Sequence, residues 1–239
     1  MDLRESSARA QWLFAQGQVS PPANRCTTWF ERRAHRAGYS SVAGVDEVGR
    51  GALFGPVLAA AVILDPRRPI RGLQDSKRLT SRQREKLAAK IRPRALAWSI
   101  ACVDAEEIDR INIYQASRLA MRLAVLGLAS QPQLVLVDAL RLDLELPQVA
   151  IVHGDALSVS IAAASILAKV ERDRLMADWD RVYPHYFLAR NKGYATAAHC
   201  ARLQELGPTP LHRRSYAPVF AALKATSAAS LGPLFASAG

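Results

Sequence analysis

The sequence predicts an α/β fold in which a sheet is flanked by helices and followed by a helical C-terminal part. Two observations favour this fold class. Short apolar runs of strand length come first and then alternate with helical patterns, and the last part of the chain shows helical patterns only. This order is typical of one sheet covered by helices. The 239 residues are enough for one or two domains.

The predicted strands are apolar segments bounded by turn or charged residues. The fourth ends at Asp138 and is apolar throughout, which is typical of a strand with helices on both sides. The first leads directly into Asp46. The strands are expected at residues 42–45, 58–64, 95–103, 134–137 and 149–152.

Helical patterns separate and follow the strands. Thr80 is a suitable N-cap for a helix that we expect Pro93 to stop. The next helical pattern is expected to break near Asn112. A longer one begins with small apolar residues on all sides, which indicates close packing against the sheet. The helices are expected at residues 80–92, 105–128, 156–182 and 196–206.

Both ends of the chain are weakly patterned. A short helix is expected to start at Trp29 and to end near Gly38. The segment after Val219 is rich in Ala, Ser and Gly and is expected to fray, although residues 220–225 could form a turn of helix. The predicted division is an N-terminal arm over 1–41, an α/β domain over 42–183, a helical extension over 184–222 and a flexible tail over 223–239.

Composition limits the classes of function. Lys and Arg number 32 against 21 Asp and Glu, which gives a net charge of +11 and favours polyanionic partners. Charge alone is equally consistent with an Arg-rich, well-solvated surface. No apolar run is long enough for a membrane span and no signal-peptide core is visible. Because Cys26, Cys102 and Cys200 are far apart, neither disulfides nor a zinc site is expected, and a reducing cytoplasm fits.

Acidic residues follow three of the predicted strands. Asp46 ends the first, Asp138 ends the fourth and Asp155 follows the fifth, while Glu47 is adjacent to Asp46. Sites in open α/β sheets form at strand ends, so these acids could share a pocket. Their mutual repulsion would be relieved by divalent cations, for which Mg²⁺ and Mn²⁺ suit oxygen ligands. Two such ions can hydrolyse a phosphodiester, and a basic protein with an acidic pocket suits that reaction.

Each acid also has a simpler structural interpretation. Asp138 could be a surface residue that ends a strand, Asp155 could be a helix N-cap, and the other two could form an exposed turn. Adjacent strand residues point to opposite faces. We therefore expect Asp46 and Glu47 to share a site only if the strand ends or bends there, which the nearby glycines permit.

Several specific motifs occur in the order of a known family. They are Gly44-Val45-Asp46-Glu47-Val48-Gly49-Arg50-Gly51, Gly55-Pro56-Val57, Asp75-Ser76-Lys77, Ile108-Asp109 with Asn112-Ile113, the strand ending in Asp138, Gly154-Asp155-Ala156, Ile161 to Val170, Arg172-Asp173, Lys192-Gly193-Tyr194 and His212-Arg213-Arg214-Ser215. On these motifs the chain resembles bacterial ribonuclease HII over roughly residues 43–219.

The resemblance implies a ribonuclease H-like mixed sheet with a C-terminal helical, substrate-binding extension. It implies an endonuclease that cuts the RNA strand of RNA–DNA hybrids and cuts 5′ to single ribonucleotides in duplex DNA. The products would carry 3′-hydroxyl and 5′-phosphate ends, and the role would be ribonucleotide removal from DNA. Two Mn²⁺ or Mg²⁺ ions would be bound together with substrate. A monomer in the cytoplasm is expected.

The resemblance also assigns residues. The metal-site acids would be Asp46, Glu47, Asp138 and Asp155. The loop of Gly49, Arg50 and Gly51 matches the segment that contacts the ribose 2′-hydroxyl, the group that distinguishes RNA from DNA. Tyr194 matches the tyrosine that packs on the deoxyribose beyond the junction; alternatively it is an ordinary surface residue in a turn. Candidate phosphate contacts, each equally a solvated charge, are Lys77, Lys169, Arg172 and Lys192.

Four residues depart from the family pattern. Ala139 and Ala195 replace glycines, Leu157 replaces a lysine and Asn191 replaces a histidine. None removes a metal-site acid. The losses of the lysine and the histidine put in question the strength of the contacts to the substrate's sugar–phosphate backbone. The sister group, ribonuclease HIII, has a lysine in its glycine loop and a large N-terminal domain, so Arg50 and the short arm favour ribonuclease HII. The alternatives are a non-catalytic RNA–DNA binding module on the same fold and a basic structural protein.

Overall fold

The structure is a computed structural model of the chain, and it describes residues 25–230, with side chains described as far as residue 225. The strands are β1 (Val42–Val48), β2 (Val57–Leu64), β3 (Ala95–Val103), β4 (Leu134–Asp138) and β5 (Gln148–Ile151). The α-helices are α2 (Trp29–Arg36), α3 (Ser81–Arg94), α4 (Ala105–Ile111), α5 (Ile113–Leu126), α6 (Gly154–Leu157), α7 (Val159–Val182), α8 (Leu188–Asn191), α9 (Ala197–Leu206) and α10 (Ala217–Ser230). Two 3₁₀ turns are η1 (Ser76–Arg78) and η2 (Pro184–Tyr186).

The strands form one mixed sheet in the order β3-β2-β1-β4-β5. β1 pairs antiparallel with β2 and parallel with β4, while β3 and β5 form the two edges. The predicted mixed sheet is therefore confirmed, with β1 at its centre. Any side chain at the C-terminal end of β1 lies close to the C-terminal end of β4.

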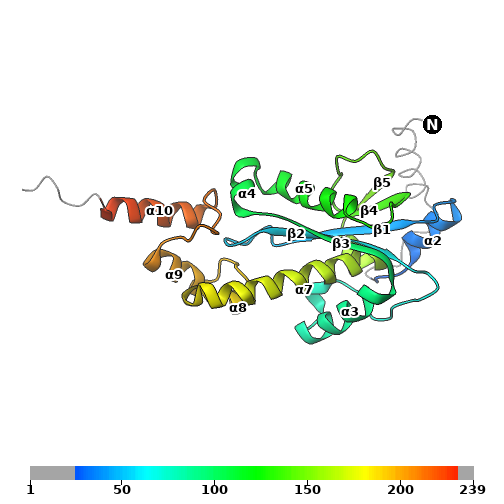
Figure 1. Cartoon of the computed structure of the whole chain (residues 1–239), viewed down its shortest axis with the longest axis horizontal. Helices are drawn as coiled ribbons and strands as arrows, with labels where there is room; N and C mark the ends of the chain where they lie inside the picture. Colours follow the sequence, from blue (N-terminus) through cyan, green and yellow to red (C-terminus); the bar gives the residue numbers. More distant parts are fainter. Residues whose placement is uncertain (1–24, 231–239) are drawn as a thin grey trace, which may run out of the picture.

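Helices cover both faces of the sheet, with α5 on one face and α3 and α7 on the other (Figure 1). The small residues at the start of α7 allow it to approach β1 closely. A Cβ atom on Gly44 would lie 2.2 Å from the backbone carbonyl carbon of Ser160, so only glycine fits at that contact. The predicted close packing of the long helix against the sheet is confirmed.

The C-terminal helices have a small core of their own, which includes two residues from the β1–β2 connection. Leu53 and Phe54 are buried there against Met176 of α7, Leu203 of α9 and Val219 of α10. Figure 1 shows the β1–β2 turn extending toward α9 and α10. The connection after β1 is thus fixed between the sheet and the C-terminal helices.

Two predicted helices need correction, and one predicted break is confirmed. Pro93 does not stop α3, which continues to Arg94, because a proline this near the end removes only one backbone hydrogen bond. The long helix is divided at Ser158, which has extended backbone and caps the N–H of Ile161. The expected break at Asn112 is confirmed, and its side chain caps α5.

The ends of the chain are only partly described. α2 confirms the short helix expected from Trp29. The turn of helix expected over residues 220–225 belongs to the longer helix α10, which reaches Ser230, so the predicted start of the flexible tail at 223 falls inside a helix. The remaining parts of the predicted arm and tail, 1–24 and 231–239, lie outside the described residues. Among the helices described, none has the length and apolar character needed to cross a membrane.

Candidate active site

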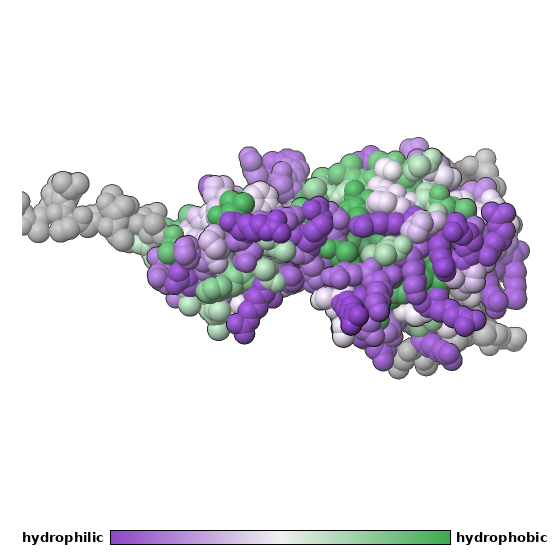
Figure 2. Space-filling view, turned by 60° about the horizontal axis from the view of Figure 1, so that its bottom comes forward, coloured by the Kyte–Doolittle hydropathy of each residue, from purple (hydrophilic) through white to green (hydrophobic). Residues whose placement is uncertain are grey.

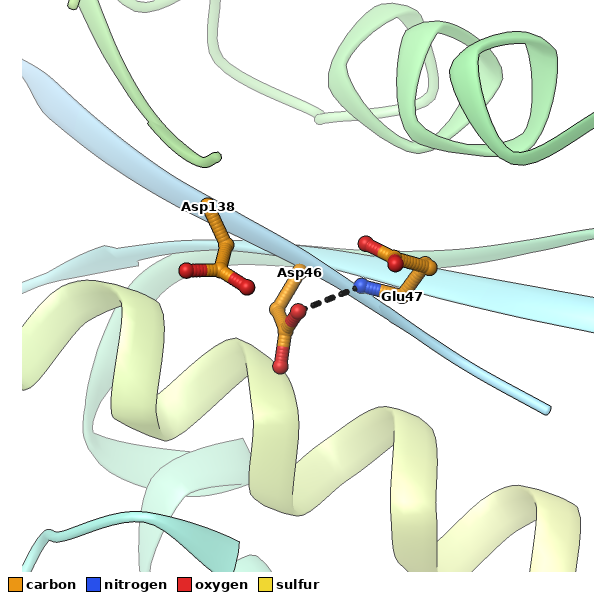
Figure 3. Close-up of side chains that lie close together, drawn as sticks. All are labelled: Asp46, Glu47 and Asp138. Carbon is orange, nitrogen blue, oxygen red and sulfur yellow. Dashed lines mark hydrogen bonds between the residues drawn. The ribbon is translucent and has the colours of Figure 1, made fainter. Parts of the chain in front are cut away.

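Three acids converge where the pairing of β1 with β4 ends. Asp46 and Glu47 lie in β1, and Asp138 is the last residue of β4. One carboxylate oxygen from each residue lies within 4.8 Å of the others. Figure 3 shows the three side chains gathered around β1, with Glu47 on the other side of the strand from Asp46. The structure thus brings together three of the four predicted metal ligands.

Asp46 and Glu47 stay inside a regular strand, contrary to the expectation that β1 must end or bend there. β1 pairs with β2 in unbroken register through Val48. Its pairing with β4 stops at Val45, so the residues that follow have one open strand edge. The two side chains leave opposite faces of the sheet and both reach Asp138 at this open edge.

Burial raises the pKa of all three carboxyls, and repulsion by neighbouring carboxylates adds to the rise for Asp46 and Glu47. Asp46 is 5% exposed, and burial raises its pKa well above the ordinary value, with further contributions from the charges of Glu47 and Asp138. Burial is also the largest cause that raises the pKa of Glu47, and the charge of Arg50 opposes this rise. Burial likewise raises the pKa of Asp138, and the hydrogen bond from the Gly154 N–H opposes it. Carboxylates this close remain charged together only with a cation between them.

The donor set fits a hard divalent cation. All the converging atoms are carboxylate oxygens, which Mg²⁺ and Mn²⁺ prefer. Oε2 of Glu47 is buried without a hydrogen-bond partner, while its Oε1 accepts from Arg50 at 3.3 Å. Oδ1 of Asp138 accepts the backbone N–H of Gly154 at 2.7 Å, which fixes the orientation of that carboxylate. The arrangement can therefore hold a divalent metal ion.

The fourth predicted acid, Asp155, lies beside this group in α6 but is not among its mutually close oxygens. It is 6% exposed, and its Oδ2 is 3.6 Å from Nζ of Lys77. Burial raises the pKa of Asp155, and the charges of Asp75 and Asp138 raise it further. The simpler interpretation of Asp155 as an N-cap is wrong, because other residues cap α6 and α7.

Lys77 extends from η1 toward the acids. Although burial opposes the shift, three nearby carboxylates, that of Asp155 first among them, raise the pKa of Lys77. Its side chain is 82% exposed, so its ammonium group remains accessible. Arg84 of α3 holds the η1 segment by donating to the backbone carbonyls of Ser76 and Leu79 at 3.0 and 2.6 Å.

The glycine loop, which consists of Gly49, Arg50 and Gly51, lies beside the acids at the end of β1. Gly49 has a φ of +93°, which favours glycine. A Cβ atom on Gly51 would lie 4.0 Å from Cε1 of Tyr194, and Ala52 forms a β-bridge with Tyr194. The structure therefore places Tyr194 directly against the loop.

Arg172 cannot contact a phosphate in this structure, and that prediction is corrected. Its side chain is 0% exposed and donates to the backbone carbonyls of Lys192 at 2.7 Å and Phe54 at 3.3 Å. Its guanidinium carbon lies 5.4 Å from the centre of the Tyr194 ring. Burial lowers the pKa of Arg172 to about 10. Arg172 supports the tyrosine and the glycine loop from beneath.

A second fully buried arginine, Arg213, supports the loop from the other side. It donates to the backbone carbonyls of Gly55 at 2.9 Å and Arg50 at 2.8 Å. The hydroxyl of Tyr216 also donates to the Arg50 carbonyl. The loop backbone is thus held rigidly by groups from the C-terminal part.

Of the remaining predicted phosphate contacts, Lys169 is mostly covered. Its Nζ lies 2.6 Å from Oδ1 of Asp173 and its side chain is 18% exposed. Lys192 has left-handed backbone with φ of +55°, and its carbonyl accepts from Arg172. The Lys77 side chain, which is 82% exposed, is therefore far more accessible than that of Lys169.

A model of the family named ribonuclease HII matches residues 43–219 of this chain. The chain belongs to the ribonuclease HII family. Two ribonuclease HII proteins are similar over most of their length. That of Koribacter versatilis (strain Ellin345) is 57% identical over 198 residues, 83% of this chain and 78% of the relative. That of Solibacter usitatus (strain Ellin6076) is 58% identical over 195 residues, 82% of this chain and 86% of the relative.

Solved structures agree with this membership. The crystal structure of ribonuclease H2 from Pyrococcus horikoshii OT3 is 28% identical with a TM-score of 0.66, and the match covers 77% of this chain and 97% of that chain. The crystal structure of Bst-RNase HIII in complex with Mn²⁺ is 21% identical with a TM-score of 0.62, covering 81% of this chain and 73% of that chain, and shows a shared fold. The predicted ribonuclease H-like fold is confirmed.

Membership confirms the predicted function and enzyme class. Ribonuclease HII is a metal-dependent endonuclease that cleaves RNA in RNA–DNA hybrids and at single ribonucleotides embedded in DNA. The acidic group of Asp46, Glu47 and Asp138 is the candidate metal site for this activity. The alternatives of a non-catalytic binding module and of a basic structural protein are thereby set aside.

The four departures from the ribonuclease HII pattern have different structural consequences. Ala139 has a φ of +52°, a strained conformation that glycine would adopt freely. Asn191 is buried; its amide donates to the Tyr186 carbonyl and accepts from the Gly193 N–H. Leu157 packs against the apolar cluster around α2, and Ala195 is exposed.

Several residues that support the ribonuclease HII site are not apparent from sequence patterns. Ser165 of α7 forms a hydrogen bond with Asp46, and this bond opposes the rise in the pKa of Asp46. The Ser165 hydroxyl also lies 2.9 Å from that of Ser76. His199 is buried behind Tyr194. Ser76 and Ser165 lie within two of the quoted motifs, Asp75-Ser76-Lys77 and the run from Ile161 to Val170. Their place in these motifs is the only sign in the sequence that they have a role.

Proposed function

We propose that the enzyme cuts 5′ to a ribonucleotide and leaves 3′-hydroxyl and 5′-phosphate ends, with Asp46, Glu47, Asp138 and Asp155 as its metal-site residues. The observation that supports this proposal is the arrangement of the site. A group of acids suited to divalent cations lies at the end of β1, the glycine loop follows directly along the chain, and Tyr194 lies against that loop. Chemistry and ribose recognition would therefore lie side by side.

The acids would hold two ions, Mn²⁺ or Mg²⁺, when substrate is bound. Such ions supply an activated water and stabilise the leaving oxygen of a phosphodiester. The buried, unpartnered Oε2 of Glu47 and the anchored carboxylate of Asp138 preorganise oxygen ligands for this purpose. Asp155 would join the set once Lys77 turns from its carboxylate to a substrate phosphate.

Recognition of the ribose would depend on the backbone of the glycine loop. Because Gly49 and Gly51 have no side chains, their backbone N–H and C=O groups can come close to a 2′-hydroxyl. The ring of Tyr194, backed by Arg172, offers a flat face to the following sugar. A 2′-hydroxyl on that second sugar would crowd the ring, so a deoxyribose is preferred there.

Phosphates of the duplex would be contacted by lysine and arginine side chains around the site. Figure 2 shows hydrophilic residues across much of the face that is turned forward in that view, with hydrophobic patches between them. Lys77, Lys169 and Lys192 stay as proposed contacts, and Arg82, Lys86 and Lys90 are exposed on α3. Such contacts release counterions, so binding would weaken steeply with salt. We also propose that the protein is a monomer and that it acts in the cytoplasm.

The test is a map of the cut. A duplex with one ribonucleotide in a DNA strand is labelled at either end of that strand and incubated with enzyme and Mg²⁺ or Mn²⁺. The proposal expects one cut, on the 5′ side of the ribonucleotide, with products that a ligase or polymerase can use as 3′-hydroxyl ends. A cut on the 3′ side, or a 2′,3′-cyclic phosphate end, would overturn it.

A further inference from the structure

Two histidines lie buried side by side behind Tyr194. His199 of α9 is 0% exposed, and His212, in the segment between α9 and α10, is 1% exposed. Their Nε2 atoms are 3.1 Å apart. Neither ring can touch substrate, and no step of the hydrolysis proposed above uses them. A buried polar pair of this kind is stable only if every nitrogen has a partner.

Backbone groups at the two ends fix where the protons lie. The N–H of Thr209 donates to Nδ1 of His212 at 3.0 Å. In a neutral ring that nitrogen then has no proton, and the proton of His212 lies on Nε2. This Nε2–H donates to Nε2 of His199. The proton of His199 therefore lies on Nδ1, which is 3.0 Å from the backbone oxygen of Tyr194.

The rings are neutral because of their surroundings. Burial lowers the pKa of His199, and burial together with the neighbouring histidine lowers the pKa of His212 to about 3. A proton added to His199 would place two N–H groups face to face across 3.1 Å. A proton added to His212 would lie on Nδ1 and would face the N–H of Thr209 at 3.0 Å. The result is a hydrogen-bonded chain with one direction, from the Thr209 N–H to the Tyr194 carbonyl.

This chain joins the segments that form the ribose-binding part of the site. Residues 52–54 follow the glycine loop and bridge to Tyr194 on one side and to His212 on the other. The ring of Phe54 meets that of His212 edge to face, with centroids 5.0 Å apart. The histidine pair connects the two outer segments from behind, so a shift at His212 reaches both Phe54 and Tyr194.

We infer that His199 and His212 are positioning residues that set Tyr194 relative to the glycine loop and thereby set the preference for a ribonucleotide–deoxyribonucleotide junction. The inference rests on the junction-contacting role proposed for Tyr194. His199 acts through the Tyr194 carbonyl, and His212 acts through His199 and Phe54. Neither histidine is a catalytic residue.

Nitrogen NMR of the full-length protein with ¹⁵N-labelled histidine tests the chain without using activity. The protein has five histidines, and single His→Gln variants assign the two signals. The inference expects His199 as the Nδ1–H form and His212 as the Nε2–H form, with coupling across the N–H···N bond. His212, whose pKa is lowered to about 3, should stay neutral between about pH 5 and 8. Two rings in the same tautomeric form, or a charged His212 in that range, would overturn the inference.

The functional test compares two variants of His212. In His212→Asn the amide replaces Nδ1 and leaves nothing at Nε2, whereas in His212→Gln the amide replaces Nε2 and can still donate to His199. The measured quantity is the ratio of kcat/KM on a single-ribonucleotide duplex to that on an all-RNA hybrid. The Asn variant should lower this ratio about fivefold, as expected for one neutral hydrogen bond, and the Gln variant should keep most of it. Exposed His185 provides the control His185→Asn, which should not change the ratio.

Tyr194→Ala separates the two proposals. If Tyr194→Ala leaves the ratio unchanged, the junction role of Tyr194 is wrong. If Tyr194→Ala lowers the ratio while a folded His212→Asn keeps the wild-type value, the positioning inference is overturned and the junction role stands. Thermal unfolding of each variant shows which are folded. Should His212→Asn fail to fold, the NMR result together with His212→Gln decides: wild-type tautomers with a wild-type ratio in the Gln variant support the inference, and opposite tautomers overturn it.

Discussion

Arg172 lies so close beneath Gly49 that a Cβ atom on Gly49 would be 2.2 Å from Nε of the arginine. The arginine has no room to move, because it is fully buried and its guanidinium donates to two backbone carbonyls. The glycine loop thus rests directly on a buried cation that also supports the ring of Tyr194. The geometry of ribose recognition depends on this contact.

Gly49→Ala should destabilise the protein strongly. The new methyl group meets Arg172 and the residue has a φ of +93°, so the free energy of unfolding should fall by about 2–4 kcal/mol. Gly51→Ala is the matched control, since its Cβ would meet only Tyr194 at 4.0 Å and should change stability little. Denaturant unfolding of both variants measures the difference. Equal stabilities would show that the loop does not rest on Arg172.

Ala139→Gly should stabilise the protein. Ala139 has a φ of +52°, and left-handed backbone costs a residue with a Cβ about 1–2 kcal/mol. The greater entropy of glycine in the unfolded chain offsets about half of the gain. A net increase of about 0.5–1 kcal/mol is expected from these two effects. Ala195→Gly at an exposed position is the comparison, and a loss of stability in Ala139→Gly would contradict the strain.

Asp46→Asn should raise the melting temperature of the metal-free protein by a few degrees at neutral pH. Burial and neighbouring carboxylates raise the folded-state pKa of Asp46, so the folded state binds this proton more tightly than the unfolded state. The wild type therefore loses stability as the pH rises from the pKa of Asp46 in the unfolded chain to its pKa in the folded protein. Asparagine does not titrate, so the variant avoids that loss. Its advantage should shrink toward pH 4. A variant less stable than wild type at neutral pH would contradict this prediction.

Mn²⁺ or Mg²⁺ should raise the melting temperature of the wild type, because an ion that binds only the folded state stabilises it by mass action. The increase should be much smaller in Asp46→Asn, which removes a charged ligand. Calorimetry over a range of metal concentrations measures both increases. An equal increase in the two proteins would place the bound ion elsewhere.

The sequence predicts the acids of this site better than the groups that support them. The strands before Asp46 and Asp138 are predictable because uninterrupted apolar runs end at those residues, and parallel strands bring such ends together. Glu47 joins the site through the open edge of β1, which depends on where β4 stops. That register is a tertiary property with no local signal.

The supporting roles of Arg172 and of the histidine pair could not be predicted, for a related reason. Arginine is rarely fully buried, and one of the carbonyls that hold Arg172 belongs to Phe54, 118 residues earlier in the chain. His199 and His212 are 13 residues apart, and the chain must turn back after α9 to bring them together. The break at Ser158 is not predicted, although serine is a favoured N-cap residue and caps α7 there.

The most direct test of the account is cleavage of a DNA duplex that contains a single ribonucleotide, in Mg²⁺ or Mn²⁺, by three proteins. The wild type should cut the duplex, and Asp143→Asn, which changes an exposed acid, should cut at the same rate. Asp46→Asn should lose essentially all activity while remaining folded. Failure of the wild type to cut with either metal, or full activity of folded Asp46→Asn, would contradict the assignment of the site.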